Sequence, residues 1–291
     1  YLKHMLLSET VDNLLPDWAF FVKCVVNANE LRPTASRESF YEDETLELVR
    51  SIHATKIKII ETVWDDNLRT GGRVFAVETD KAFAAIDPNA DWAFYIQADE
   101  IVHEDTYAAI KESMEHWKDD KNVEGLLLEF IHFYGSYQYV ADAYNWHRRE
   151  IRIIKNDKNI ASYKDSMGFR KFGQKLGVKH SGGVIHHYSY VKPPVKMMNK
   201  ARAMDRLWHD DKWVEEKFGD AVEYDFSNID SLKLFEGTYP AIMKDRIARQ
   251  NWQFSFDVTK SKMKLKYRLK RWIERHFGVV IGEYRNYRLL D

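Results

Sequence analysis

A short apolar stretch that ends in polar residues is the part of the sequence best suited to chemistry. Trp92–Ile96 is an unbroken apolar and aromatic run, and Gln97, Asp99 and Glu100 follow it. The run predicts a buried strand of an α/β sheet, and ligands of open α/β sheets bind at the carboxyl ends of strands. Two carboxylates placed there can hold a divalent cation through their oxygens. The alternative is that Asp99 and Glu100 cap a helix expected to begin near Glu104.

Alternating strands and helices precede and follow this stretch and must position it. The pattern of apolar residues predicts strands at Trp18–Val26 and Lys56–Val63, and helices at Leu2–Leu15, Glu44–His53, Arg73–Ile86 and about Glu104 to Lys118. This β-α-β-α order is typical of a mainly parallel sheet that is flanked by helices. The expected fold class is therefore α/β.

The pattern changes after Lys121. Gly125–Phe133, Arg149–Lys155 and Gly182–Val191 have the character of strands, and no long helix separates them. Short strands of this kind favour an antiparallel or mixed edge of the sheet. From Pro193 onward the chain is expected to be helical.

The composition limits the class of protein. Of the 291 residues, 45% are hydrophobic and 31% are charged, which predicts a packed core and a soluble protein. A net charge of −1 produces no overall electrostatic field that would attract nucleic acid, so no nucleic-acid partner is expected. No apolar run is long enough to predict a membrane-spanning helix, and the single cysteine, Cys24, fits a reducing, cytoplasmic location.

The stretch Lys260–His276 is the most basic part of the chain, and its only acidic residue is Glu274. Leu265, Leu269, Trp272 and Ile273 fall on one face of a helix. A basic amphipathic helix can lie on an anionic membrane surface, which would place the protein at the inner face of the membrane. The alternative is that the apolar face packs on the rest of the protein.

Several motifs, taken in order, resemble glycosyltransferase family 2, which has the GT-A fold. The runs are KIKIIETVWDDNLRTGGRVFAVETDKAF, which starts at Lys56, and ADWAFYIQADEIVHE, which starts at Ala90. HFYGSY, REIRIIKN, YKDSMGFRK, VIHHYSYVKPP and FEGTYP resemble a bacterial branch of the same family. The resemblance implies an inverting, metal-dependent transfer of a sugar from a nucleotide-diphosphate sugar to a glycan or lipid-linked acceptor, in the synthesis of surface polysaccharide.

The resemblance also implies an organisation of the chain. Residues 1–192 would form a GT-A-like catalytic domain, with a nucleotide-binding half at 1–120 and an acceptor-side half at 121–192. Residues 193–291 would form a helical extension packed on this domain. The first strand of the family is not found, and a sheet without it would leave unpaired backbone edges. We therefore expect residues to precede Tyr1 in the intact protein.

A divalent ion, Mn²⁺ or Mg²⁺, would neutralise the charge that develops on the diphosphate leaving group. By resemblance, Asp99 matches the metal-binding Asp of the family, and Gln97 stands where another Asp is usual. Gln adds no charge, so metal binding is weaker or Glu100 compensates. His187 is a candidate further ligand because imidazole binds such ions, and its alternative role is that of a packed strand histidine, with His186 on the opposite face.

The nucleotide-sugar is expected to contact residues from three loops. Arg69, Gly71 and Gly72 precede a helix, where glycines allow close approach of the backbone and amides favour phosphate. Asp65, with the adjacent Asp66, ends a predicted strand and could reach the nucleotide, or else is a solvated loop residue. By resemblance, Asp43 contacts the base of the nucleotide, and its alternative role is that of a helix cap.

Inversion requires a carboxylate that takes the proton of the acceptor hydroxyl. Asp165 in YKDSMGFRK is the candidate base by resemblance, Glu129 and Asp142 are its rivals, and a turn residue is the alternative role. Further candidates for contact with diphosphate are Arg148, Arg149 and Arg152. The aromatic residues between the two halves could line a groove for the acceptor or pack in the core; they are Phe133, Tyr134, Tyr137, Tyr139, Tyr144 and Trp146.

Two other functions remain open at this point. A nucleotidyltransferase would use a related sheet, but it would require a Gly-rich loop with Arg and Lys near the N-terminus, and the sequence has none there. A non-catalytic glycan-binding or scaffold protein, derived from a glycosyltransferase, is favoured by Gln97 and by the missing first strand. Turnover of a sugar donor distinguishes an enzyme from this last class.

Overall fold

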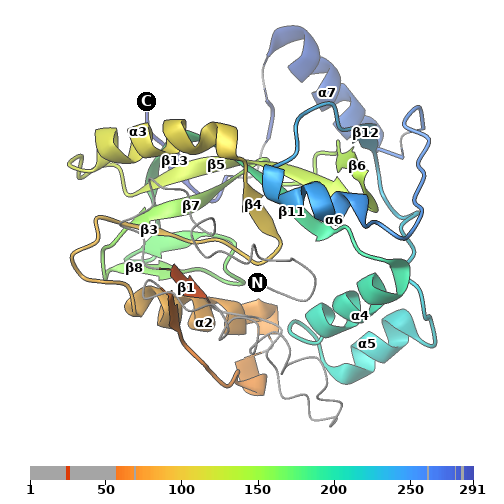
Figure 1. Ribbon diagram of the computed structural model, residues 1–291, viewed down its shortest axis with the longest axis horizontal. Coiled ribbons are helices and arrows are strands. Elements are labelled where there is room, and N and C mark those ends of the chain that lie inside the picture. The colour runs from red at the N-terminus through yellow and green to blue at the C-terminus, as the bar shows by residue number, and fades with distance from the viewer. Residues whose placement is uncertain (1–23, 27–56, 69, 261, 279, 283–284) are drawn as a thin grey trace.

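The computed structural model describes residues 24–26, 57–68, 70–260, 262–278, 280–282 and 285–291. Within these ranges the protein is a mixed α/β structure with six α-helices and an eight-stranded sheet (Figure 1). The helices are α2 (Arg73–Ala84), α3 (Tyr107–Trp117), α4 (Pro194–Asp205), α5 (Asp211–Phe218), α6 (Lys244–Ala248) and α7 (Leu265–Phe277).

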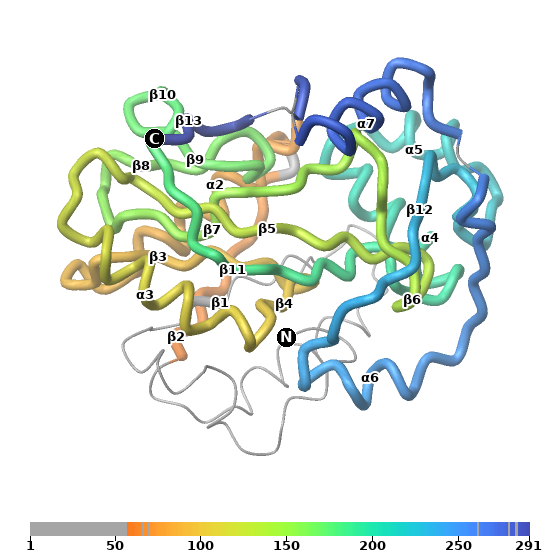
Figure 2. The backbone as a smooth tube through the Cα atoms, turned by 90° about the horizontal axis from the view of Figure 1, so that it is seen from above, coloured from red at the N-terminus to blue at the C-terminus, as the bar shows by residue number. Residues whose placement is uncertain are grey.

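The large sheet is mostly antiparallel. Its strands are β3 (Trp92–Phe94), β4 (Glu100–Val102), β5 (Gly125–Tyr134), β6 (Ser136–Ala141), β7 (Arg149–Lys155), β11 (Gly177–Tyr190), β12 (Leu232–Leu234) and β13 (Arg288–Leu289). The order is β12-β6-β5-β11-β13, β7 joins β5 to β3, and β4 pairs with β11. Among the described pairs of this sheet, only β5–β11 and β11–β13 are parallel. Figure 2 shows β7, β5 and β11 side by side through the middle of the molecule.

The prediction of a mainly parallel sheet is therefore wrong for the described residues. β5 and β6 are joined at Gly135 alone, and strands joined by so short a turn must run in opposite directions. β3 is an edge strand that pairs with β7 in antiparallel register, Trp92 opposite Lys155. A parallel pair of the predicted kind is formed by β1 (Cys24–Val26) and β2 (Ile57–Ile59), which make up a separate two-stranded sheet.

Two cores lie on opposite faces of the large sheet. Leu126 and Leu128 of β5 pack with Ile110 of α3 on one face. Leu127 and Ile151 pack on the other face, toward the small sheet of β8 (Ile160–Ser162), β9 (Phe169–Lys171) and β10 (Gln174–Lys175). The consecutive leucines of β5 are buried because both faces of this strand are covered. Figure 1 shows α3 along one side of the sheet and α2 along the other.

Local sequence signals explain where several helices begin and end. Gly71 and Gly72 both have positive φ, 65° and 66°, immediately before α2, a conformation that glycine adopts without strain. Asp210 accepts a hydrogen bond from the Trp213 amide at the start of α5. Pro194 occupies the first turn of α4, and Gly278 with φ of 67° ends α7.

Most strands and helices predicted within the described ranges are confirmed. β7 has the predicted bounds, and α2, α3 and β5 differ from the predictions by a few residues at their ends. The C-terminal part contains α4 to α7, but most of its described residues lie outside helices, and it also contributes β12 and β13 to the large sheet. The predicted helices at Leu2–Leu15 and Glu44–His53 lie outside the described residues.

Candidate functional site

Asp99 lies on the connection between β3 and β4 and is fixed against β11. Its carbonyl accepts a hydrogen bond from the Tyr188 amide at 2.8 Å. Its carboxylate accepts from Lys200 Nζ at 2.8 Å, and its other oxygen lies 3.6 Å from His187 Nε2. Burial alone would raise the pKa of Asp99, but Lys200, joined by His187 when that ring is protonated, outweighs it and holds this pKa well below its usual value. Asp99 is therefore an anion at neutral pH.

A chain of hydrogen bonds through His132 orients the ring of His187. His132 Nε2 lies 2.7 Å from the carbonyl oxygen of His147, which can only accept, so this nitrogen carries the proton. Burial, reinforced by the neighbouring His187, lowers the pKa of His132 to about 3, so the ring is neutral. Its Nδ1 then accepts from His187 Nδ1 at 2.8 Å. Whenever His187 is neutral, its unprotonated Nε2 therefore faces Asp99.

This pair of atoms fits part of the coordination sphere of a divalent ion. The described residues contain no group of three or more His, Cys, Asp and Glu side chains that could hold a metal by themselves. Asp99 Oδ1 and His187 Nε2, however, are 3.6 Å apart and share no hydrogen bond when the ring is neutral. Mg²⁺ and similar ions commonly take one or two protein ligands and complete their shell with substrate phosphates and water. The second ring nitrogen of His187 is held by His132, as is usual for ligating histidines.

Glu100 and Gln97 have other partners in the structure. Glu100 is buried and accepts from Arg152 through both oxygens, at 2.6 and 2.9 Å. Arg152 also lies over the rings of Tyr95 and Phe130. The prediction that Glu100 compensates for Gln97 as a metal ligand gains no support from this geometry, because the ion pair uses both carboxylate oxygens. Gln97 donates from its side chain to the Tyr95 hydroxyl at 3.0 Å.

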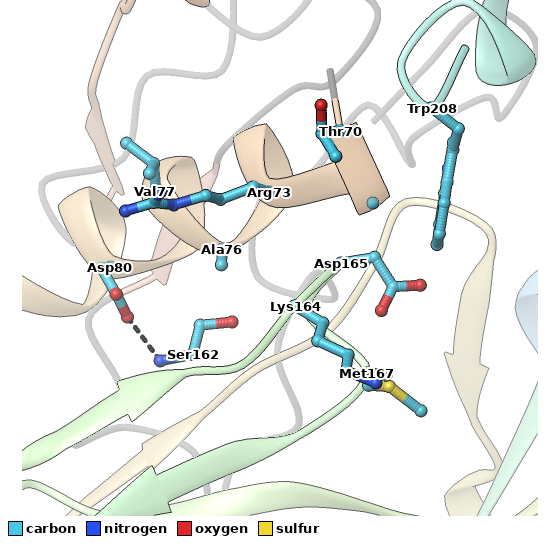
Figure 3. Close-up of a pocket in the computed structure, with 11 residues that line it drawn as sticks. Thr70, Arg73, Ala76, Val77, Asp80, Ser162, Lys164, Asp165, Met167 and Trp208 are labelled. Carbon is cyan, nitrogen blue, oxygen red and sulfur yellow. Dashed lines mark hydrogen bonds between the residues drawn. The ribbon is translucent and has the colours of Figure 1, made fainter. Parts of the chain in front are cut away.

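A cavity of about 700 Å³ lies between the start of α2 and the loop that follows β8 (Figure 3). This volume is typical of sites for small molecules. The lining residues are Thr70, Gly71, Arg73, Ala76, Val77, Asp80, Ser162, Lys164, Asp165, Met167 and Trp208. Figure 3 shows Asp80 bound to the Ser162 amide at one end, and Asp165 and Trp208 toward the other.

The structure brings Gly72 and Asp165 together, although they are far apart in the sequence. A Cβ added to Gly72 would lie 2.9 Å from Asp165 Cβ and 3.0 Å from Trp208 Cε2. Such contacts are too close for any side chain, and φ of Gly72 is 66°. Only glycine therefore allows α2 to begin directly against the loop that carries Asp165.

The loop around Asp165 is held in a strained conformation. Lys164 and Ser166 on either side have positive φ, 54° and 62°, which non-glycine residues rarely adopt. Ser166 Oγ lies 2.8 Å from Thr79 Oγ1 on α2 and 3.1 Å from Ser162 Oγ. Backbone strain of this kind concentrates at functional sites. Burial raises the pKa of Asp165 and outweighs two hydrogen bonds from backbone amides that lower it.

Glu150 is a candidate functional residue that the sequence interpretation missed. It lies on β7, is 8% exposed, and its Oε2 is buried without a hydrogen-bond partner among the described residues. Burial raises the pKa of Glu150 to about 7; Arg152 opposes the rise, and the charges of Glu100 and Asp165 add to it. The signal was available, because Glu150 and Arg152 are charged residues at alternate positions of a predicted strand, on one face, and they flank Ile151.

The remaining predicted site residues lie elsewhere. Asp65 is exposed and accepts from the Asn67 amide at 2.8 Å in its own loop. Asp142 pairs with Arg271 of α7 at 2.6 Å, and Glu129 is exposed on β5 beside Arg149. These two rivals of Asp165 do not line the large cavity. The predicted contacts of Asp43 and Arg69 lie outside the described residues.

Most members of the predicted aromatic groove are core residues. Phe133, Tyr134 and Tyr137 are at most 3% exposed and pack with residues of β11 and the C-terminal part. Tyr144 is different, because its ring lies parallel to that of Tyr267 on α7 and its hydroxyl donates to Glu274. The packing interpretation therefore holds for the buried members.

Neither a protein-family model nor a curated protein matches this chain. The class that the fold defines is a mixed α/β protein with a mostly antiparallel sheet. None of the helices in the described ranges is long and apolar enough to cross a membrane.

Proposed function

We propose that this protein has a GT-A-like arrangement and transfers a sugar, with inversion, from a nucleotide-diphosphate sugar to a hydroxyl of a glycan or lipid-linked acceptor. The observation that carries the proposal is the pairing of Asp99, which follows β3, with His187 on β11. This pair supplies two ligand atoms on the end of the sheet where the sequence predicts a donor site. We further propose that the protein works in the cytoplasm, in the synthesis of bacterial surface polysaccharide.

The diphosphate of the donor requires positive charge. A bound Mn²⁺ or Mg²⁺, held by Asp99 and His187, would neutralise the leaving group. Lys200 binds Asp99 and keeps it ionised, so the carboxylate remains available as a ligand at neutral pH. Arg73 and Lys164 line the large cavity, and the amides at the start of α2 add a partial positive charge there. These groups support the binding of an anion such as a nucleoside diphosphate.

Asp165 is the proposed base. In the transfer, the acceptor hydroxyl gives its proton to the Asp165 carboxylate while its oxygen forms a bond to the anomeric carbon of the sugar. The bond from that carbon to the diphosphate breaks, and the diphosphate leaves with the bonding electrons. The raised pKa of Asp165 makes it a stronger base than an exposed carboxylate. Glu150 is close enough to interact electrostatically with Asp165 and is proposed to set the charge around it.

The test is the thermal stability of the protein against a panel of nucleoside diphosphates, with and without Mn²⁺. A ligand that binds only the folded state raises the unfolding midpoint by mass action. We expect one diphosphate to raise it in a metal-dependent manner, and Asp99→Asn to abolish this shift. Glu112→Gln, which removes the same charge from an exposed position of α3, is the matched control. Absence of a shift with every nucleotide, in folded wild-type protein, would overturn the proposal.

A second candidate is a non-catalytic glycan-binding or scaffold protein. It is favoured by Gln97, which adds no charge, and by Lys200, which already neutralises Asp99 through a 2.8 Å ion pair. Release of nucleoside diphosphate from a sugar donor, at a rate that depends on acceptor and falls in Asp165→Asn, would exclude this second function. Binding of glycans without any such release would favour it.

A further inference from the structure

Helix α7 is attached to the protein by its polar side. Glu274 accepts hydrogen bonds from Arg148 and from the Tyr144 hydroxyl. Arg271, one turn earlier, pairs with Asp142 at 2.6 Å. These two residues and Tyr267, which stacks on Tyr144, lie on one face of the helix. The helix is therefore held by ion pairs and a ring contact rather than by an apolar seam.

The apolar side of α7 is turned to solvent. Within the part of the chain that the structure describes, the exposed fractions are 79% for Leu265, 58% for Leu269, 50% for Trp272 and 66% for Phe277. The first three follow the spacing i, i+4, i+7 and lie on the face opposite Glu274. A surface helix normally buries such a stripe, so this orientation is the reverse of the usual one. In Figure 1, α7 lies at the periphery of the molecule.

Cations border this apolar stripe. The exposed basic residues on and before the helix are Lys262, Lys264, Lys266, Arg268 and Arg275. Helical spacing places Arg268 and Arg275 on one flank of the stripe and Lys266 on the other. Glu274 is the only acidic residue of the helix, and it faces the body of the protein. The outward face thus combines large apolar side chains with uncompensated positive charge.

We propose that α7 binds the surface of an anionic lipid bilayer, with its axis in the membrane plane. Leu265, Leu269, Trp272 and Phe277 would enter the boundary between head groups and acyl chains, and the flanking cations would contact anionic head groups. A second copy of this chain fits less well, because two such faces would bring like charges together. The proposal does not depend on sugar transfer.

Flotation of the full chain with vesicles tests this proposal without any nucleotide. We expect binding to vesicles of phosphatidylglycerol and phosphatidylcholine, little binding to phosphatidylcholine alone, and weaker binding at high salt. The double variant Leu269→Glu/Trp272→Glu should lose binding at least tenfold. Phe172→Glu/Val222→Glu, which places the same two charges at positions 75% and 70% exposed elsewhere, should bind as the wild type does.

A charge variant separates the two contributions. Arg268→Gln/Arg275→Gln keeps the apolar stripe and should weaken binding roughly fivefold for each charge removed, because each basic residue near the surface contributes about that factor. Since all these positions are exposed, the unfolding midpoints should stay at the wild-type value. Failure of the wild type to bind anionic vesicles would overturn the proposal. So would a wild-type dimer in sedimentation that the Leu269→Glu/Trp272→Glu variant converts to a monomer.

Discussion

Two regions of this molecule hold carboxylates in opposite states. In the Asp99 region, which consists of Asp99, His187, His132 and Lys200, the carboxylate is paired and its pKa is lowered. In the Asp165 region, which consists of Asp165, Glu150, Ser166 and Thr79, burial dominates and raises the pKa of both carboxylates. The first arrangement suits a permanent anion that binds cations. The second favours the protonated form of each carboxylate, and for Glu150 it brings the pKa to about 7.

The difference teaches which chemistry each region can support. A carboxylate that binds a cation must remain charged, and Lys200 secures this for Asp99 at the cost of competing for one oxygen. A carboxylate that accepts a proton must be basic, and desolvation supplies this for Asp165, which forms no salt bridge with another described residue.

Replacement of Asp165 by Asn should produce the largest effect. Loss of a general base reduces turnover by about 10²- to 10⁴-fold, and the binding of donor should be retained because no charge is removed from the Asp99 region. Glu129→Gln, which changes the rival carboxylate that is exposed on β5, should leave the rate unchanged. Steady-state rates of both variants give the comparison, and the reverse ranking would move the base to Glu129.

The change Glu150→Gln tests the buried charge by its pH dependence. The pKa of Glu150 is about 7 in the folded protein against an ordinary value of 4.5, so the unfolded chain loses this proton first as pH rises. The free energy of unfolding of the wild type should therefore fall as pH rises from 4.5 to 7. The total loss, complete above pH 7, should be on the order of 3 kcal/mol. In Glu150→Gln this loss should be absent. Urea unfolding at several pH values measures it.

The control for the buried charge is Glu112→Gln, whose carboxylate is exposed on α3. Its stability should follow the wild-type dependence on pH. If Glu150→Gln and Glu112→Gln gave the same pH profile, Glu150 would not be the protonated group.

A pair of variants separates charge from ligation in the Asp99 region. Asp99→Asn leaves the Lys200 cation, 15% exposed, without its anionic partner, which should lower the free energy of unfolding by roughly 1–3 kcal/mol. Lys200→Met removes the cation and keeps the carboxylate. We expect the metal-dependent thermal shift to be lost in Asp99→Asn and kept in Lys200→Met. Loss in both variants would indicate that Lys200, rather than a metal, receives the diphosphate.

The smallest expected effect comes from the hydroxyl that holds the Asp165 loop. Thr79→Val keeps the shape of the side chain and removes the buried hydrogen bond to Ser166, which should lower the free energy of unfolding by about 1 kcal/mol. Thr259→Val removes an exposed hydrogen bond to Asp257 and should cost less than about 0.5 kcal/mol. Urea unfolding compares them, and equal costs would mean that this contact does not stabilise the loop.

Much of the local structure could be predicted, and much of the pairing could not. The bounds of β7 and the start of α2 follow from apolar runs and from Gly71 and Gly72, which act within a few residues. The direction of β3 relative to its neighbour could not be predicted from the sequence, because a three-residue strand can pair with β7 as readily as with a parallel neighbour. Asp99 and His187 were both singled out, but their contact depends on the pairing of β4 with β11.

By itself, the sequence determined which segments form strands and helices, and it marked Asp99, Asp165 and the basic helix as unusual. These features depend on side-chain periodicity and on local backbone preferences. The tertiary structure alone decided that Glu100 is bound by Arg152, that Glu150 Oε2 is buried without a hydrogen-bond partner among the described residues, and that α7 turns its apolar face outward. Contacts between distant residues are set by how whole elements pack, and a local pattern carries no information about which elements will meet.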